Sequence, residues 1–198
     1  MDLLASPLPE TVEVCGEAVP IRWGWRRAVR SYSVTSKGKA ATEQDVRMLL
    51  ASWFSRGRDV PKAVLDHPVE ALDAALAWRD RPMAEAVRYG TGLPGKPSSG
   101  LFDWEADSAI VVADFQRLYG IDLGSWQGHW WRFCALLLPL ALMEGSLVSA
   151  AMSARLPIPS DLPKEERKAR ERLRGAWALP LSDDELARII NARIKAEW

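Results

Sequence analysis

The start of the chain alternates apolar and polar residues, which is the pattern of a β-strand with one buried face. Two short alternating runs, separated by Cys15 and Gly16, contain four apolar residues: Val12, Val14, Val19 and Ile21. This pattern predicts a small β-hairpin. Because two strands alone are only marginally stable, we expect the hairpin to pack on the helix that carries Trp25 and Val29.

After the hairpin the apolar residues recur at intervals of three and four, which is the spacing of an amphipathic helix. Thr42 and Asp45 predict a capping box at the start of a second helix, which should end near Gly57. Further helices are expected from Pro68, from Asp103 to a C-cap at Gly120, from the GHWWRF stretch at 128–133, and after Ser182. Six apolar side chains are predicted to share one core: Trp104, Phe115, Leu118, Trp130, Phe133 and Leu137.

The fold class is therefore predicted to be mainly α, a helical domain with a short N-terminal β-hairpin and a C-terminal helical extension. The core domain should span residues 1–155 and the extension residues 156–198. The boundary lies at the proline-rich segment LPIPSDLP, after which a charge-dense helix begins at 164. A glycine- and proline-rich stretch at 89–100 is expected to be a loop or a hinge within the core domain.

The charge of the chain is balanced, with 26 basic and 26 acidic residues, so it has no overall attraction to nucleic acid or to an anionic membrane. Ten tryptophans are the unusual feature, because such side chains concentrate at packing joints and at interaction surfaces. The two cysteines do not suggest a disulfide framework. The longest apolar run, 133–143, is too short to cross a bilayer. We therefore expect a cytosolic protein without a membrane contact.

Catalytic and metal-binding patterns are not evident in the sequence. His67 and His129 do not lie at a metal-ligand spacing from another histidine or cysteine, so roles at helix ends or in hydrogen bonds are favoured. Cys134 lies on an apolar helix face, which favours an inert buried thiol. The stretch GTGLPG at 90–95 lacks the lysine and the strand-to-helix context of a phosphate-binding loop. We expect no enzyme activity, no cofactor and no metal ion.

The stretch RWGWRRAVR at 22–30 combines guanidinium groups with indole rings, which together can contact phosphates and stack on bases. It supports an alternative hypothesis, a basic-aromatic module that binds nucleic acid. The favoured interpretation is a first helix whose tryptophans pack on the hairpin while its arginines stay in solvent.

The adjacent tryptophans of GHWWRF point about 100° apart on a helix, so they should not face the same neighbour. Trp130 is the predicted core residue. Trp131, Ala135 and Leu138 form the predicted partner-binding face, together with Trp126, and Trp131→Ala should then weaken binding more than folding. The alternative is that the helix is covered on all sides and both rings belong to the core.

Four blocks follow one another along the chain: LPETVEVCGEAVPI, DVPKAVLDHPVEALDAALAW, FDWEADSAIVVADFQRLYGIDL with GHWWRFCALL, and a basic helix ending in WALP. In this order they resemble the tail assembly chaperone family of long-tailed bacteriophages, in the version encoded just before the tape-measure gene. The most specific block is 102–133, and the resemblance covers nearly the whole chain. In the family a more polar turn and helix usually stand in place of PLALMEGSLVSAAMSAR.

The resemblance implies an assembly factor without enzyme activity that binds the tape-measure protein, keeps it soluble and promotes assembly of the tail tube around it. The tail-tube protein is a second expected partner, and self-association in several copies is a further expectation. The protein would act in the host cell cytoplasm during phage assembly and would be absent from the mature virion. Its apolar helix faces agree with this role, because they can hold the apolar face of another helix.

Overall fold

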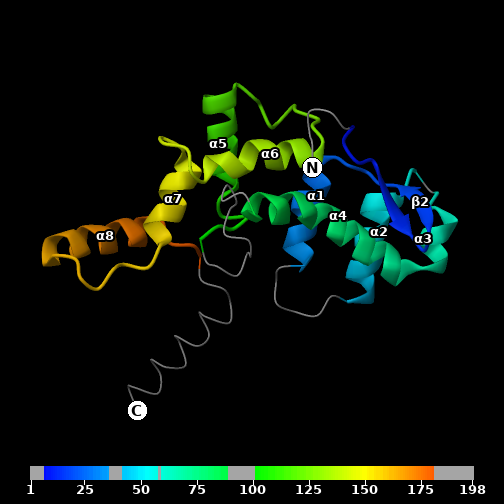
Figure 1. Cartoon of the computed structure of the whole chain (residues 1–198), viewed down its shortest axis with the longest axis horizontal. Helices are drawn as coiled ribbons and strands as arrows, with labels where there is room; N and C mark the ends of the chain where they lie inside the picture. Colours follow the sequence, from blue (N-terminus) through cyan, green and yellow to red (C-terminus); the bar gives the residue numbers. More distant parts are fainter. Residues whose placement is uncertain (1–6, 36–41, 58, 89–100, 181–198) are drawn as a thin grey trace, which may run out of the picture. The chain divides into compact units, whose positions relative to one another are not determined.

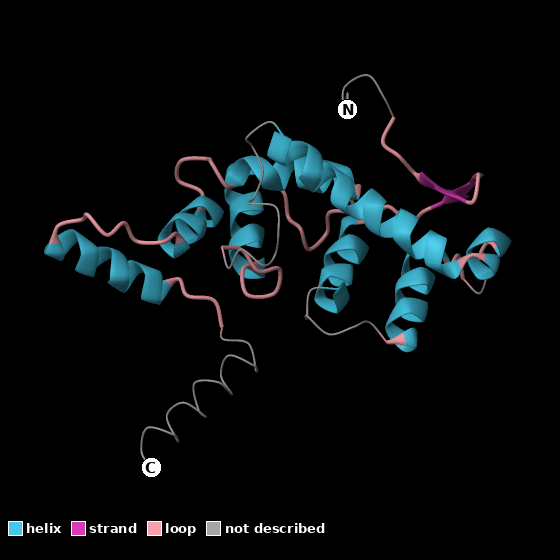
Figure 2. Ribbon diagram, turned by 60° about the horizontal axis from the view of Figure 1, so that its bottom comes forward, coloured by secondary structure: helices cyan, strands magenta, loops and turns pink. Residues whose placement is uncertain are grey.

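The computed structural model describes residues 7–35, 42–57, 59–88 and 101–180. The chain divides into two compact units, Met1–Met152 and Ser153–Trp198. Helices make up most of the described residues, as expected for the mainly α class (Figure 2). The expected loop at 89–100 and the helix expected after Ser182 lie outside the described residues. The division into domains 1–155 and 156–198 stays a prediction.

The elements of the first unit begin with a two-stranded hairpin and continue through helices (Figure 1). Their bounds are β1 Thr11–Val14, β2 Glu17–Pro20, α1 Trp25–Thr35, α2 Glu43–Phe54, α3 Lys62–Asp66, α4 Pro68–Arg88, α5 Ser108–Tyr119 and α6 Trp130–Leu140. A further helix, α7 (Leu147–Arg155), spans the point of division. No helix among the described residues is long and apolar enough to cross a membrane.

The predicted hairpin is confirmed. β1 and β2 pair antiparallel with Val12 opposite Val19, and the residues of the turn, Cys15 and Gly16, have φ angles of 48° and 84°. The expected packing partner is wrong, because the main helical neighbour of β1 is α4 and not the helix that carries Trp25. The carbonyl of Pro9, just before β1, accepts hydrogen bonds from Trp78 Nε1 at 3.0 Å and from the His129 ring at 3.2 Å. The hairpin is therefore held where α4 meets the start of α6.

Local sequence signals place most helix ends. Thr42 and Asp45 form the predicted capping box of α2, which ends shortly before Gly57. Pro68 is the first residue of α4, and Gly120 closes α5 with a left-handed φ of 66°. The predicted start of α5 is wrong. Asp103 instead accepts two backbone N–H groups within a separate turn, so the helix begins only at Ser108.

The predicted core is confirmed, with Trp130, Phe133 and Leu137 of α6 at its centre. Phe115 of α5 stacks on Phe133 with 5.0 Å between the ring centroids. The two remaining predicted members, Trp104 and Leu118, are partly buried against this cluster. Pro139 lies in the last turn of α6, which ends one residue later, as its missing N–H predicts.

The second unit contains α8 (Lys164–Ala176), the predicted charge-dense helix. None of its residues is buried. Within this unit the Arg155 side chain donates a hydrogen bond to the Trp177 carbonyl at 2.6 Å. The predicted helix of the extension is thus present among the described residues.

Candidate partner-binding surface

Both tryptophans of the GHWWRF stretch are buried. Trp130 is 0% and Trp131 is 2% exposed, so the expectation that Trp131 faces outward is wrong. The expectation that the two rings do not face the same neighbour is also wrong. Both reach α4, because Trp130 Nε1 donates to the Arg79 carbonyl at 2.7 Å and Trp131 Nε1 to the Trp78 carbonyl at 3.2 Å. The adjacent indoles therefore bond to adjacent carbonyls of one neighbouring helix.

A proline in α4 explains why this helix can receive an indole. In an α-helix the carbonyl of residue 78 accepts the N–H of residue 82. Residue 82 is Pro82, which lies inside α4 and has no N–H. The Trp131 indole supplies the missing donor to the Trp78 carbonyl. A buried carbonyl without a partner would be costly, so the second tryptophan has a structural role at this joint.

The start of α6 is fixed by His129. Its Nδ1 accepts the backbone N–H of Trp131 at 3.1 Å, so the histidine is the N-cap of the helix. In that tautomer Nε2 carries the proton and donates to the Pro9 carbonyl. Burial lowers the pKa of His129, which favours this neutral form. The predicted helix-end role of this histidine is confirmed.

The other three predicted partner-binding residues differ in exposure. Leu138 is buried, Trp126 is partly buried and Ala135 is exposed. The Trp126 ring covers Gly128 so closely that a Cβ atom there would lie 1.9 Å from it. Trp126 also contacts the Phe133 ring, with 6.4 Å between centroids. Ala135 is thus the exposed member of the predicted face.

A stripe of exposed residues runs along the outward side of α6 and continues just past its end. We call it the α6 stripe, and it consists of Arg132, Ala135 and Pro139 of α6 and of Leu142 in the turn that follows the helix. These positions follow at intervals of three and four, and all four are exposed, with Leu142 at 65%. An exposed leucine next to alanine and proline is a surface on which an apolar helix can dock. The sequence pattern missed this set, because the predicted face was built on the side of the helix that carries Trp131 and Leu138.

The basic-aromatic stretch is largely engaged inside the protein. Trp25 stacks on Phe133 of α6 with 4.8 Å between centroids, not on the hairpin as expected. Arg26 is partly buried and donates to the carbonyls of Leu123, Gly124 and Trp126. Partial burial, with Arg30 and Arg22 nearby, lowers the pKa of Arg27. The stretch therefore joins α1 to the 123–126 loop and to α6.

A buried charge network joins α1 to α4. Arg79 is 5% exposed and forms an ion pair with Asp80 at 2.7 Å. Its guanidinium lies 3.9 Å above the Tyr32 ring, and the Tyr32 hydroxyl donates to Asp80 at 2.8 Å. Burial, followed by the charge of Asp80, raises the pKa of Tyr32. Each charge has partners within the network, which indicates a structural role.

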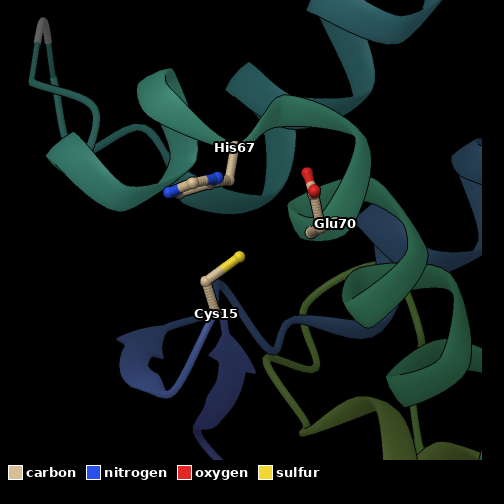
Figure 3. Close-up of side chains that lie close together, drawn as sticks. All are labelled: Cys15, His67 and Glu70. Atoms are coloured by element: carbon tan, nitrogen blue, oxygen red, sulfur yellow. The ribbon is translucent and has the colours of Figure 1, made fainter.

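The candidate reactive groups fall into two kinds. Cys134 is buried, and burial raises the pKa of its thiol, in agreement with the predicted inert role. Cys15, His67 and Glu70, in contrast, are exposed and lie together, with their ligand atoms within 4.8 Å of one another (Figure 3). Sequence spacing could not reveal this group, because it depends on the packing of the hairpin beside the start of α4.

These features define a helical protein whose buried aromatic side chains support an exposed apolar helix face. The chain belongs to a bacteriophage family, the bacteriophage Gp15 proteins, whose model matches residues 4–179. Comparison with curated proteins and with solved structures returned no match. The protein is therefore a phage protein of the Gp15 family.

Proposed function

We propose that this protein is a tail assembly chaperone that binds the tape-measure protein, keeps it soluble and promotes assembly of the tail tube around it. The observation that carries the proposal is membership of a bacteriophage family across residues 4–179. The chaperone role is supported by the resemblance of the 102–133 block, FDWEADSAIVVADFQRLYGIDL followed by HWWRF, to such chaperones. It would act in the host cytoplasm during assembly and leave before the virion is complete.

The α6 stripe is the proposed contact with the tape-measure protein. Its apolar side chains, Ala135, Pro139 and Leu142, can cover the apolar face of a partner helix, while Arg132 can pair with an acidic residue at the edge. Trp130 and Trp131 hold the opposite side of α6 on α4. A fixed backbone lowers the entropy lost on binding, which favours affinity.

Co-expression with the tape-measure protein of the same phage tests this proposal. The chaperone should keep the tape-measure protein in the soluble fraction and co-purify with it. Each protein expressed alone serves as the reference. Failure of the intact protein both to bind and to solubilise the tape-measure protein would contradict the chaperone role.

A matched pair of variants tests the surface. Leu142 in the α6 stripe and Leu65 in α3 are both 65% exposed, so Leu142→Asp and Leu65→Asp introduce the same change at equal exposure. We expect Leu142→Asp to reduce recovery of the complex about tenfold or more, as for a central apolar contact, and Leu65→Asp to leave it unchanged. Equal effects of the two substitutions would exclude the α6 stripe as the binding surface.

A further inference from the structure

We propose that Cys15, His67 and Glu70 form a zinc-binding site that fastens the hairpin to the junction of α3 and α4. Cys15 lies in the turn between β1 and β2, His67 lies between the two helices, and Glu70 lies in the first turn of α4. One ligand atom from each residue lies within 4.8 Å of the other two. Figure 3 shows the Cys15 sulfur pointing from the hairpin toward the space between the other two side chains.

The chemistry of the three donors matches zinc. A thiolate, an imidazole and a carboxylate are groups that bind Zn²⁺, and where a site has three protein ligands a water molecule completes the tetrahedron. With usual Zn–S, Zn–N and Zn–O lengths, the ligand atoms of a tetrahedral site are about 3.4–3.6 Å apart. In the structure the three ligand atoms lie within 4.8 Å of one another. All three side chains are exposed, so rotation about their χ angles can bring the ligand atoms to zinc distance.

The position of Cys15 is unusual for a side chain without a role. It is the first residue of a two-residue turn in which both φ angles are positive, at 48° and 84°. Asparagine, aspartate or glycine is preferred at such a position, because other side chains are strained there. Gly16 fits the second position, whereas a cysteine at the first gains no comparable benefit from the turn. Ligation of a metal would offset the strain.

The backbone on the other side of the site is well fixed. The N–H of His67 donates to the Ala63 carbonyl at 3.0 Å, and the His67 carbonyl accepts the N–H of Ala71 at 3.0 Å. Pro68, the first residue of α4, follows His67 directly and restricts the backbone conformation of the histidine. Glu70 follows His67 by three residues, a spacing that places two side chains on one side of a helical turn. The imidazole and carboxylate thus come from a rigid segment, and the thiol from a separate element.

Glu70 also has an ordinary role that must be separated from metal binding. An acidic residue in the first turn of a helix stabilises the helix dipole without any ligand. This role would persist in the absence of zinc and would not involve Cys15 or His67. The proposal therefore requires that all three side chains contribute to the affinity for one metal ion.

The two cysteines allow a spectroscopic test on the full chain. Co²⁺ bound to a thiolate gives a charge-transfer band in the near ultraviolet, and Cys134 is buried and does not compete. We expect the band to saturate at one Co²⁺ per chain and to disappear when Zn²⁺ is added. Zn²⁺ should also raise the thermal midpoint of unfolding, because it binds the folded hairpin arrangement and not the unfolded chain.

The decisive variants are Cys15→Asn, His67→Gln and Glu70→Gln. Each should weaken Zn²⁺ affinity about tenfold or more, since loss of an outer-shell contact alone already has an effect of that size. Cys15→Asn places a favoured residue in the turn, so its metal-free form should unfold no more easily than the parent protein. Glu17→Gln in the same hairpin and Asp73→Asn one turn along α4 remove the same charge nearby and should leave the affinity unchanged.

Three results would overturn the zinc site. One is the absence of a Co²⁺ charge-transfer band in the intact protein, and another is a band that persists in Cys15→Asn. The third is Zn²⁺ affinity that is unaffected by His67→Gln or by Glu70→Gln. None of these results bears on binding of the tape-measure protein, which is measured separately through the α6 stripe.

Discussion

The helices α6 and α8 have similar lengths, 11 and 13 residues, but they are stabilised by different parts of the protein. Seven residues of α6 are buried, and none of α8 is. The α6 sequence is poor in charge and contains a proline, so its stability comes from contacts with α1, α4 and α5. Burial of a large face can thus stabilise a helix that its own sequence would support weakly.

α8 has no buried residues and carries several favourable interactions within its own sequence. Glu165 and Glu166 lie in its first turn and Arg174 in its last, an arrangement that complements the helix dipole. Arg167 pairs with Glu171 across one turn with 3.6 Å between charged atoms. Such exposed pairs contribute little individually. The comparison predicts large mutational effects on the inner side of α6 and small effects on α8.

The largest effect is expected when either tryptophan of α6 is truncated. Trp130→Ala and Trp131→Ala should each lower the free energy of unfolding by about 3–5 kcal/mol, because each removes a buried aromatic side chain. Urea unfolding followed by circular dichroism measures the change. If Trp131→Ala lowers the free energy of unfolding by less than about 1 kcal/mol and Trp130→Ala has a large effect, the original prediction is supported. In that prediction Trp130 is a core residue and Trp131 contacts a partner.

A smaller effect tests the bond between Trp131 and the Trp78 carbonyl. Trp131→Phe removes the indole donor and should cost about 1–3 kcal/mol, because the carbonyl opposite Pro82 loses its partner. Pro82→Ala restores a backbone N–H in α4, so the same Trp131→Phe change should cost at least about 1 kcal/mol less in that background. A double-mutant cycle of unfolding free energies measures this coupling.

Trp130→Phe is the matched control for the cycle. The Trp130 indole donates to the Arg79 carbonyl. In the helix that carbonyl accepts the N–H of Met83, so it does not depend on the proline for a donor. Pro82→Ala should therefore leave the cost of Trp130→Phe unchanged. Equal coupling at both tryptophans would show that Pro82 acts through general helix stability and not through the missing donor.

The smallest effect is expected in α8. Glu171→Gln removes the exposed ion pair with Arg167 and should change the free energy of unfolding by less than about 0.5 kcal/mol. The difference should become smaller still at high salt, because the pair is accessible to solvent. A loss comparable with that of Trp131→Phe would mean that α8 is stabilised by contacts beyond its own residues.

Features that depend on neighbours in the sequence were predicted well. The hairpin follows from a period of two, the capping box from Thr42 and Asp45, and the end of α5 from Gly120. The prediction for the start of α5 was wrong although it also rests on neighbouring residues. Asp103 can cap a helix or close a turn, and the sequence does not distinguish the two uses.

Features that join distant segments could not be predicted in the same way. The hairpin was expected on α1 and packs on α4, since the apolar face of a strand fits more than one helix. The α6 stripe could not be predicted, because which side of α6 is exposed depends on the burial of Trp131 and Leu138. The close approach of Cys15 to His67 and Glu70 likewise results from that packing.

The sequence by itself determined the helical class, the hairpin and the central place of Trp130, because periodicity and capping act over a few residues of one chain segment. Only the tertiary structure decided the role of Trp131. Pro82 leaves a carbonyl of α4 without its helical donor, and an indole from α6, far along the chain, supplies it. A hydrogen bond between two packed helices depends on their positions in space, and no local pattern encodes those positions.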